Sequence, residues 1–177
     1  MNKTIQLLIP MSGQGQRFQD AGYTEPKPLI QISGRPMIER LLADFPTEWP
    51  TTFVLAENHA SSGLPELLKR LRPSATLLYV PPHKLGPGHA VDAALASGAL
   101  DEEAPVFVSY CDYGVVWDAR AFERYVRDTD CDACLTCYRG FHAHYLTPQM
   151  YAYCRMAGER VVEIREKACF TDDRESE

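Results

Sequence analysis

The residues best suited to chemistry lie in a glycine-rich loop near the amino terminus, which reads Met11-Ser12-Gly13-Gln14-Gly15. Because glycine has no Cβ, the backbone N–H groups of such a loop can approach the oxygens of a phosphate closely. Arg17 follows the loop, and Lys27 stands between two prolines further along the chain. Guanidinium and ammonium groups both bind phosphate well, so this pattern predicts a site for a nucleoside triphosphate.

Two other phosphate-binding loops are excluded by the residues around the glycines. A P-loop ends in Gly-Lys-Ser or Gly-Lys-Thr, and no such triplet closes this segment. A dinucleotide-binding fingerprint needs a third glycine at the position of Phe18. The remaining alternative is an ordinary glycine turn beside two solvated cations. The order of the glycines, Arg17 and the lysine motif disfavours that alternative.

The order Gly-x-Gly-x-Arg, followed by Pro26-Lys27-Pro28-Leu29, resembles the signature of the sugar-phosphate nucleotidylyltransferases, in the nucleotidyl transferase superfamily. Residues 10–18, with Gly22 and Tyr23, are most similar to bacterial members of surface-polysaccharide pathways. The resemblance implies transfer of a nucleotide from a nucleoside triphosphate to a sugar 1-phosphate, or a similar phosphate monoester, with release of pyrophosphate. It also implies that Arg17 and Lys27 are the catalytic cations, on the leaving pyrophosphate and on the reacting phosphates.

Three further segments match the pattern of this family. Asp112 follows the apolar run 106–110, where relatives have an aspartate that binds the catalytic Mg²⁺; from the residues alone it could equally cap a turn. The segment Leu85-Gly86-Pro87-Gly88 resembles the loop that meets the nucleobase, partly through backbone groups. Near the end of the chain, Glu166 and Lys167 resemble the strand end whose lysine binds the sugar phosphate.

The sequence departs from the family at two points. Pro87 replaces a polar residue common in relatives, and Pro81 and Pro82 lie where uridine-using members often have a glutamine, so the base is left open. The resemblance also stops before a further strand-and-helix set, in which relatives carry a second ligand for Mg²⁺. We therefore expect either a C-terminally truncated piece of a longer protein or a ligand supplied from elsewhere, such as Asp172 or Asp173.

Apolar runs alternate with segments of helical period, which is typical of an α/β fold. The expected strands cover residues 5–10, 52–56, 76–80 and 106–110, with later candidates at 133–138, 150–156 and 160–164. The expected helices cover residues 36–44, 64–71, 89–99 and 119–127, the last with Asp118 as its N-cap. This alternation predicts three layers: a mostly parallel, twisted sheet with helices on both faces. The family resemblance likewise implies a Rossmann-like, nucleotide-diphospho-sugar transferase-like fold.

Composition limits the class of protein and its partners. A chain of 177 residues, 45% of them hydrophobic, suits a single domain over residues 1–177. The net charge of −6 argues against nucleic acid and anionic membranes as partners, which leaves the nucleoside triphosphate and the sugar phosphate. Neither a signal peptide nor an apolar stretch of the roughly 20 residues that span a bilayer is present, so we expect a cytoplasmic protein. Relatives frequently form dimers or larger assemblies, which makes a homo-oligomer a further expectation.

The cysteines raise the alternative of a metal site. Cys131, Cys134 and Cys137 have the spacing C-x-x-C-x-x-C of some iron–sulfur and zinc proteins, and His142 and His144 could join Cys137 around a zinc ion. No fourth cysteine follows at a ferredoxin-like spacing. The apolar residues between the cysteines favour a buried strand with core cysteines, and the two histidines favour an exposed loop.

Three other functions stay open. A glycosyltransferase of related fold would consume a nucleotide-sugar, but it normally shows Asp-x-Asp where this chain has Asp112-Tyr113-Gly114. A molybdopterin-type or isoprenoid-type cytidylyltransferase shares the glycine loop, with its lysine motif spaced more tightly. A non-catalytic nucleotide-binding module is the third alternative, because the second metal ligand of the family is missing.

Overall fold

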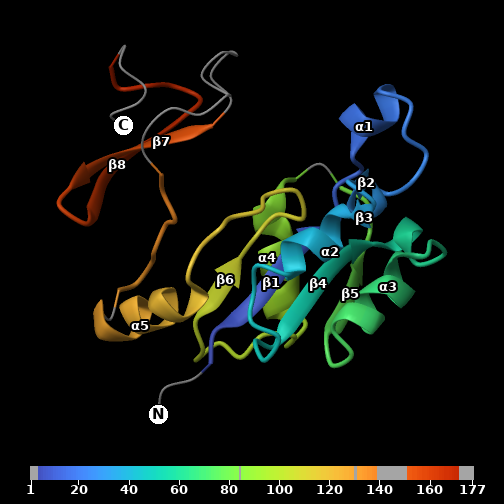
Figure 1. Cartoon of the computed structure of the whole chain (residues 1–177), viewed down its shortest axis with the longest axis horizontal. Helices are drawn as coiled ribbons and strands as arrows, with labels where there is room; N and C mark the ends of the chain where they lie inside the picture. The colour runs from blue at the N-terminus through green and yellow to red at the C-terminus, as the bar shows by residue number, and fades with distance from the viewer. Residues whose placement is uncertain (1–3, 84, 130, 139–150, 172–177) are drawn as a thin grey trace. The chain divides into compact units, whose positions relative to one another are not determined.

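The structure is a computed structural model that describes residues 4–83, 85–129, 131–138 and 151–171 (Figure 1). The chain consists of two compact units, Met1–Asp130 and Cys131–Glu177. The single domain expected over residues 1–177 therefore stays a prediction. Within the described ranges, no helix is both long enough and apolar enough to pass through a lipid bilayer.

A four-stranded parallel sheet forms the centre of the first unit (Figure 1). Its strands stand in the order β5 (Thr76–Val80), β4 (Thr51–Ala56), β1 (Gln6–Met11) and β6 (Val106–Val108). The chain moves outward from β1 to β4 and β5 and then returns to the other side of β1 for β6. The connections therefore diverge at the carboxyl end of β1, where open α/β sheets bind their ligands.

Helices and short elements connect these strands. In chain order they are α1 (Gln16–Asp20), the 3-10 turn η1 (Lys27–Leu29), the two-residue strands β2 (Gln31–Ile32) and β3 (Arg35–Pro36), α2 (Met37–Leu42), the 3-10 turn η2 (Glu57–His59), α3 (Leu64–Leu71), α4 (Pro87–Ala96) and α5 (Ala119–Thr129). Asp118 caps α5 as predicted, because its Oδ1 accepts the backbone N–H groups of Arg120 and Ala121, both at 2.9 Å.

The two faces of β1 bury separate parts of the core. Leu7 and Ile9 belong to a cluster that includes the apolar side chains of α2 and α3. Leu8, between them in the sequence, packs on the other face with Ala90 and Ala94 of α4. Alternate side chains of a strand point to opposite faces, so a continuous apolar run such as β1 needs helices on both. The predicted three-layer α/β fold is confirmed.

Most of the predicted elements of the first unit are confirmed with shifted ends. The helix at 64–71 and the strand at 76–80 match the structure, whereas the strand expected at 106–110 ends at Val108. The helix expected at 89–99 begins two residues earlier at Pro87, since proline is favoured in the first turn of a helix. The sequence analysis missed α1 and η1, which carry Arg17 and Lys27.

The described part of the second unit is a β-hairpin. Its strands β7 (Ala152–Ala157) and β8 (Arg160–Glu166) pair antiparallel with each other, which confirms two late strand candidates near their predicted positions. The buried strand predicted at 133–138 is wrong. Those residues form neither helix nor strand and are exposed, as are Cys131, Cys134 and Cys137. A strand forms only where a partner strand pairs with it, and in the described part of the second unit only β7 and β8 pair.

The backbone of Gly15 gives a test of the loop geometry. Gly15 precedes α1 with φ 64° and ψ 28°, in the left-handed region that a Cβ disfavours by about 1–2 kcal/mol. We expect Gly15→Ala to lower the free energy of unfolding by about 1 kcal/mol in urea titrations. Gly13→Ala is the matched control, because Gly13 has no positive φ and an added Cβ there would meet nothing within 4 Å. Equal losses in both variants would contradict the assigned backbone constraint.

Candidate active site

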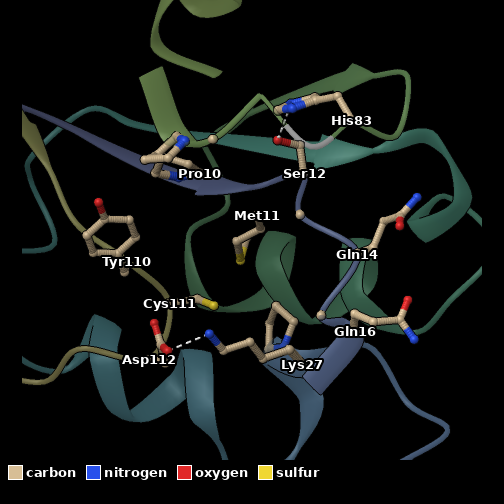
Figure 2. Close-up of a pocket in the computed structure, with 15 residues that line it drawn as sticks. Pro10, Met11, Ser12, Gln14, Gln16, Lys27, His83, Tyr110, Cys111 and Asp112 are labelled. Carbon is tan, nitrogen blue, oxygen red and sulfur yellow. Dashed lines mark hydrogen bonds and ion pairs between the residues drawn. The ribbon is translucent and has the colours of Figure 1, made fainter. Parts of the chain in front are cut away.

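A cavity of about 430 Å³ lies at the carboxyl ends of β1, β5 and β6 (Figure 2). Its volume lies within the range of roughly 300–1,000 Å³ that is usual for small-molecule sites. The lining comes from the end of β1, the loops after these strands, η1 and the first residues of α1 and α4. It consists of Pro10, Met11, Ser12, Gly13, Gln14, Gly15, Gln16, Lys27, Pro28, His83, Gly86, Pro87, Tyr110, Cys111 and Asp112. All of these residues belong to the first unit.

The predicted glycine-rich loop lines the cavity over its whole length, from Met11 to Gly15. Met11 and Ser12 are 4% and 2% exposed, so the start of the loop is anchored in the core. Gly13 is exposed, with no atom near the position that a Cβ would take. The backbone of the loop is therefore open to a ligand at the point where the sequence predicts phosphate.

Lys27 and Asp112 form an ion pair across one side of the cavity, although they are 85 positions apart in the chain. Lys27 Nζ donates to Asp112 Oδ2 (Figure 2), and the two side chains are 25% and 41% exposed. The same ammonium group lies 5.3 Å from the ring centre of Phe18 on α1, within the range of a cation–π interaction. One cation and one carboxylate thus face the same space from different elements.

Of the residues predicted in the base-reading loop and at Arg17, only some line the cavity. In the expected base-reading loop, Gly86 and Pro87 line the cavity, whereas Leu85, which is 72% exposed, and Gly88 do not. Arg17 is exposed on α1, directly after Gln16 of the lining, and is itself outside the lining. Its predicted contact with pyrophosphate stays a prediction.

Glu166 and Lys167 belong to the second unit. Glu166 ends β8 as expected, and Lys167 follows with its Nζ 3.5 Å from Glu166 Oε1. Their predicted contact with a sugar phosphate stays a prediction. The segment that contains His142 and His144 lies outside the described residues.

Cys111 also lines the cavity, and its thiol is not in the reactive, deprotonated form. It is 6% exposed, and burial raises the pKa of its thiol to about 11. The nearby charge of Lys27 lowers this pKa by less than burial raises it, and Asp112 adds a further increase. At neutral pH the group is a protonated thiol, whereas the thiolate is the nucleophilic form.

The sequence analysis gave no site role to several lining residues, among them Cys111, Tyr110 and His83, and of these His83 bonds to the glycine-rich loop. Its Nε2 lies 2.9 Å from Ser12 Oγ, and its Nδ1 accepts the backbone N–H of Leu85 at 3.2 Å. Its ring meets that of His89 edge to face, with 4.4 Å between the ring centres. The nearest sequence signal was the adjoining segment from Leu85 to Gly88, but no local pattern links His83 to a serine 71 positions away.

The possible metal ligands at the cavity suit an ion that the protein shares with a bound substrate. Among the described residues, no group of three or more His, Cys, Asp or Glu side chains could hold a metal ion, and this includes Cys131, Cys134 and Cys137. Asp112 offers one carboxylate at the cavity. Mg²⁺ is often held by one or two carboxylates together with the phosphates of a substrate, so Asp112 fits an ion shared with a polyphosphate.

Comparison with solved structures confirms the fold. The nucleoside-diphosphate-sugar pyrophosphorylase of Vibrio cholerae RC9 superimposes with a TM-score of 0.71 at 19% identity, over 94% of this chain and 69% of that one. The inositol-1-phosphate CTP transferase of T. maritima gives a TM-score of 0.67 at 14% identity, over 97% of this chain and 67% of that one.

Sequence comparisons place the chain in a family. The bifunctional protein GlmU of Paracoccus denitrificans (strain Pd 1222) is 30% identical over 93 residues, which are 52% of this chain and 20% of GlmU. GlmU of Paraburkholderia xenovorans (strain LB400) is 32% identical over 108 residues, 61% of this chain and 22% of GlmU. The chain thus spans about a fifth of the length of these curated relatives. The family model described as "MobA-like NTP transferase domain" matches residues 7–169, so the chain belongs to this family of nucleotidyltransferases, as the glycine loop and the lysine motif predict.

Proposed function

We propose that this protein transfers a nucleotide from a nucleoside triphosphate to a sugar 1-phosphate, or to a similar phosphate monoester. The observation that carries the proposal is the single cavity shared by the glycine-rich loop, Lys27 and Asp112. The family match supports the nucleotidyl transfer. Two proteins of the same fold, a nucleoside-diphosphate-sugar pyrophosphorylase and an inositol-1-phosphate CTP transferase, agree with a phosphate monoester as the acceptor.

The reaction needs no nucleophile from the protein. An oxygen of the acceptor phosphate attacks the α-phosphorus of the triphosphate, a P–O bond forms, and the bond to the leaving pyrophosphate breaks. Catalysis is then mainly positioning and neutralisation of charge. The N–H groups of Gly13 and Gly15 would bind the triphosphate, and Lys27 would contact the reacting phosphates. Cys111 stays a neutral thiol and takes no part in the transfer.

Arg17 and the Glu166–Lys167 pair complete the proposal. Arg17 would hold the leaving pyrophosphate, which its place beside the lining residue Gln16 on the same short helix supports. Lys167, next to Glu166, would bind the incoming sugar phosphate, a role supported by the sequence resemblance. Cytoplasmic location, homo-oligomeric assembly and a place in surface-polysaccharide synthesis belong to the proposal on the same ground.

We also propose that Asp112 holds Mg²⁺ when a triphosphate is bound. The ion would supply charge neutralisation at the α-phosphate. In the structure, the carboxylate of Asp112 is paired with Lys27. Phosphate oxygens would accept hydrogen bonds from Lys27 Nζ, and the carboxylate would then be free to bind the ion. Metal and nucleotide should therefore bind together rather than independently.

Removal of the Lys27 charge tests the transfer itself. We expect Lys27→Met to lower kcat/KM by about 10²–10³, the usual effect of losing an electrostatic stabiliser of the transition state. The melting temperature should stay near that of the wild type, because a partly exposed ion pair contributes at most about 1 kcal/mol. The measurement is release of pyrophosphate with a panel of nucleoside triphosphates and sugar phosphates.

Arg35→Met is the matched control, because it removes the same charge at a residue that pairs with Glu39 and does not line the cavity. An equal loss of activity in both variants would contradict a specific role of Lys27. The product identifies the reaction class. Release of a nucleoside diphosphate from a nucleotide-sugar would show a glycosyltransferase, and nucleotide binding without product would show a binding module.

Metal binding tests the role of the ion pair independently of activity. Lys27 competes with a cation for Asp112, so we expect Lys27→Met to bind Mn²⁺ about tenfold more tightly than the wild type when no nucleotide is present. Electron paramagnetic resonance of free Mn²⁺ measures this affinity. Arg35→Met again controls for net charge. Adding Asp112→Asn to the Lys27→Met variant should abolish the gain in Mn²⁺ affinity. An unchanged affinity in Lys27→Met would show that the pair does not restrict access to the carboxylate.

A further inference from the structure

His83 connects two loops that approach the cavity from different strands. One is the glycine-rich loop after β1, which it reaches through Ser12 Oγ at 2.9 Å. The other is the loop between β5 and α4, where it accepts the N–H of Leu85 at 3.2 Å. Ser12 is 2% exposed and therefore firmly held, whereas Leu85 is 72% exposed and has few neighbours to hold it. The imidazole thus ties an exposed loop to a buried one.

The two hydrogen bonds determine the form of the imidazole ring. Because Nδ1 accepts from the backbone of Leu85, it carries no proton. The proton of the neutral ring must then be on Nε2, which donates to Ser12 Oγ. A positively charged ring has protons on both nitrogens and cannot accept the N–H of Leu85. The hydrogen bond to Leu85, which lies in the same loop as His83, therefore requires a neutral ring. The bond that joins the two loops is the one to Ser12, to which the Nε2–H group donates.

The place of His83 in the cavity indicates what the connection does. Figure 2 shows Ser12 and His83 along one side of the cavity and the Lys27–Asp112 pair along the opposite side. His83 is therefore remote from the charged groups proposed to act on the reacting phosphates. Its effect should fall on nucleotide binding rather than on the chemical step.

We propose that His83 is a positioning residue, which sets the spacing between the glycine-rich loop and the loop 85–88 so that one nucleotide fits both. This inference rests on the proposed function, in which the first loop binds the triphosphate and the second meets the nucleobase. A nucleotide can reach only a limited distance from its base to its phosphates, so a loop free to move away from Ser12 has to be brought back at a cost in affinity.

Two substitutions at one position separate positioning from general structural support. His83→Ala removes both hydrogen bonds, and we expect KM for the nucleoside triphosphate to rise about tenfold with kcat within about threefold of the wild type. His83→Gln is the conservative variant, because its amide can accept from Leu85 and donate to Ser12 without titrating. It should restore KM to within about threefold at pH 8.

A loss confined to kcat in His83→Ala would overturn the proposal. A KM of His83→Gln as high as that of His83→Ala would overturn it as well.

A nucleotide-free measurement keeps this inference separate from the proposed function. Nitrogen-15 NMR of the full chain at about pH 8 should show His83 as the Nε2–H tautomer. Amide exchange at Leu85 should accelerate in His83→Ala and not in His83→Gln. The opposite tautomer, or unchanged exchange, would overturn the positioning role. If the tautomer and the exchange agree but no triphosphate binds or reacts, the proposed function fails and the connection between the loops stands.

Discussion

Parallel pairing of β1 with both β4 and β6 is the constraint on which the candidate site depends. Strands that run in the same direction end at the same edge of a sheet, so the loops after β1, β5 and β6 gather there. The change in winding direction beside β1 separates these loops and leaves the cavity between them. The two-sided core around Leu7 and Leu8 holds β1 in the centre and so holds the cavity at its end.

Charge in the cavity is balanced locally although the chain as a whole is acidic. A net charge of −6 repels an anionic ligand at long range, so a phosphate needs cations at short range. Lys27 provides one, and Asp112 forms an ion pair with it. Phe18 supports the ammonium group from α1. The buried, protonated thiol of Cys111 lines the cavity without adding charge.

Residues whose roles depend on their neighbours in the sequence could be predicted. The glycine-rich loop and Asp118 as an N-cap follow from neighbouring residues, and the structure has each at the expected element. Asp112 lines the cavity from a turn after β6, because the strand expected to run to residue 110 ends at Val108. His83 was not predictable, because its role depends on Ser12, 71 positions away. The strand predicted at 133–138 is wrong for a related reason. Apolar composition favours a strand, but a strand also needs a partner strand. Residues 133–138 pair with none of the described strands and are exposed.

By itself, the sequence determined the class of the protein. The alternation of apolar runs with helical segments specifies an α/β sheet, and the glycines with Arg17 and the Pro-Lys-Pro motif specify a nucleotidyltransferase, because these signals act over a few neighbouring residues. Only the tertiary structure decided which side chains share a cavity. It brought Lys27 to Asp112 and His83 to Ser12, and it left Arg17 on the exposed face of α1. Such pairings depend on strand order and on loop paths, which residues close in sequence do not encode.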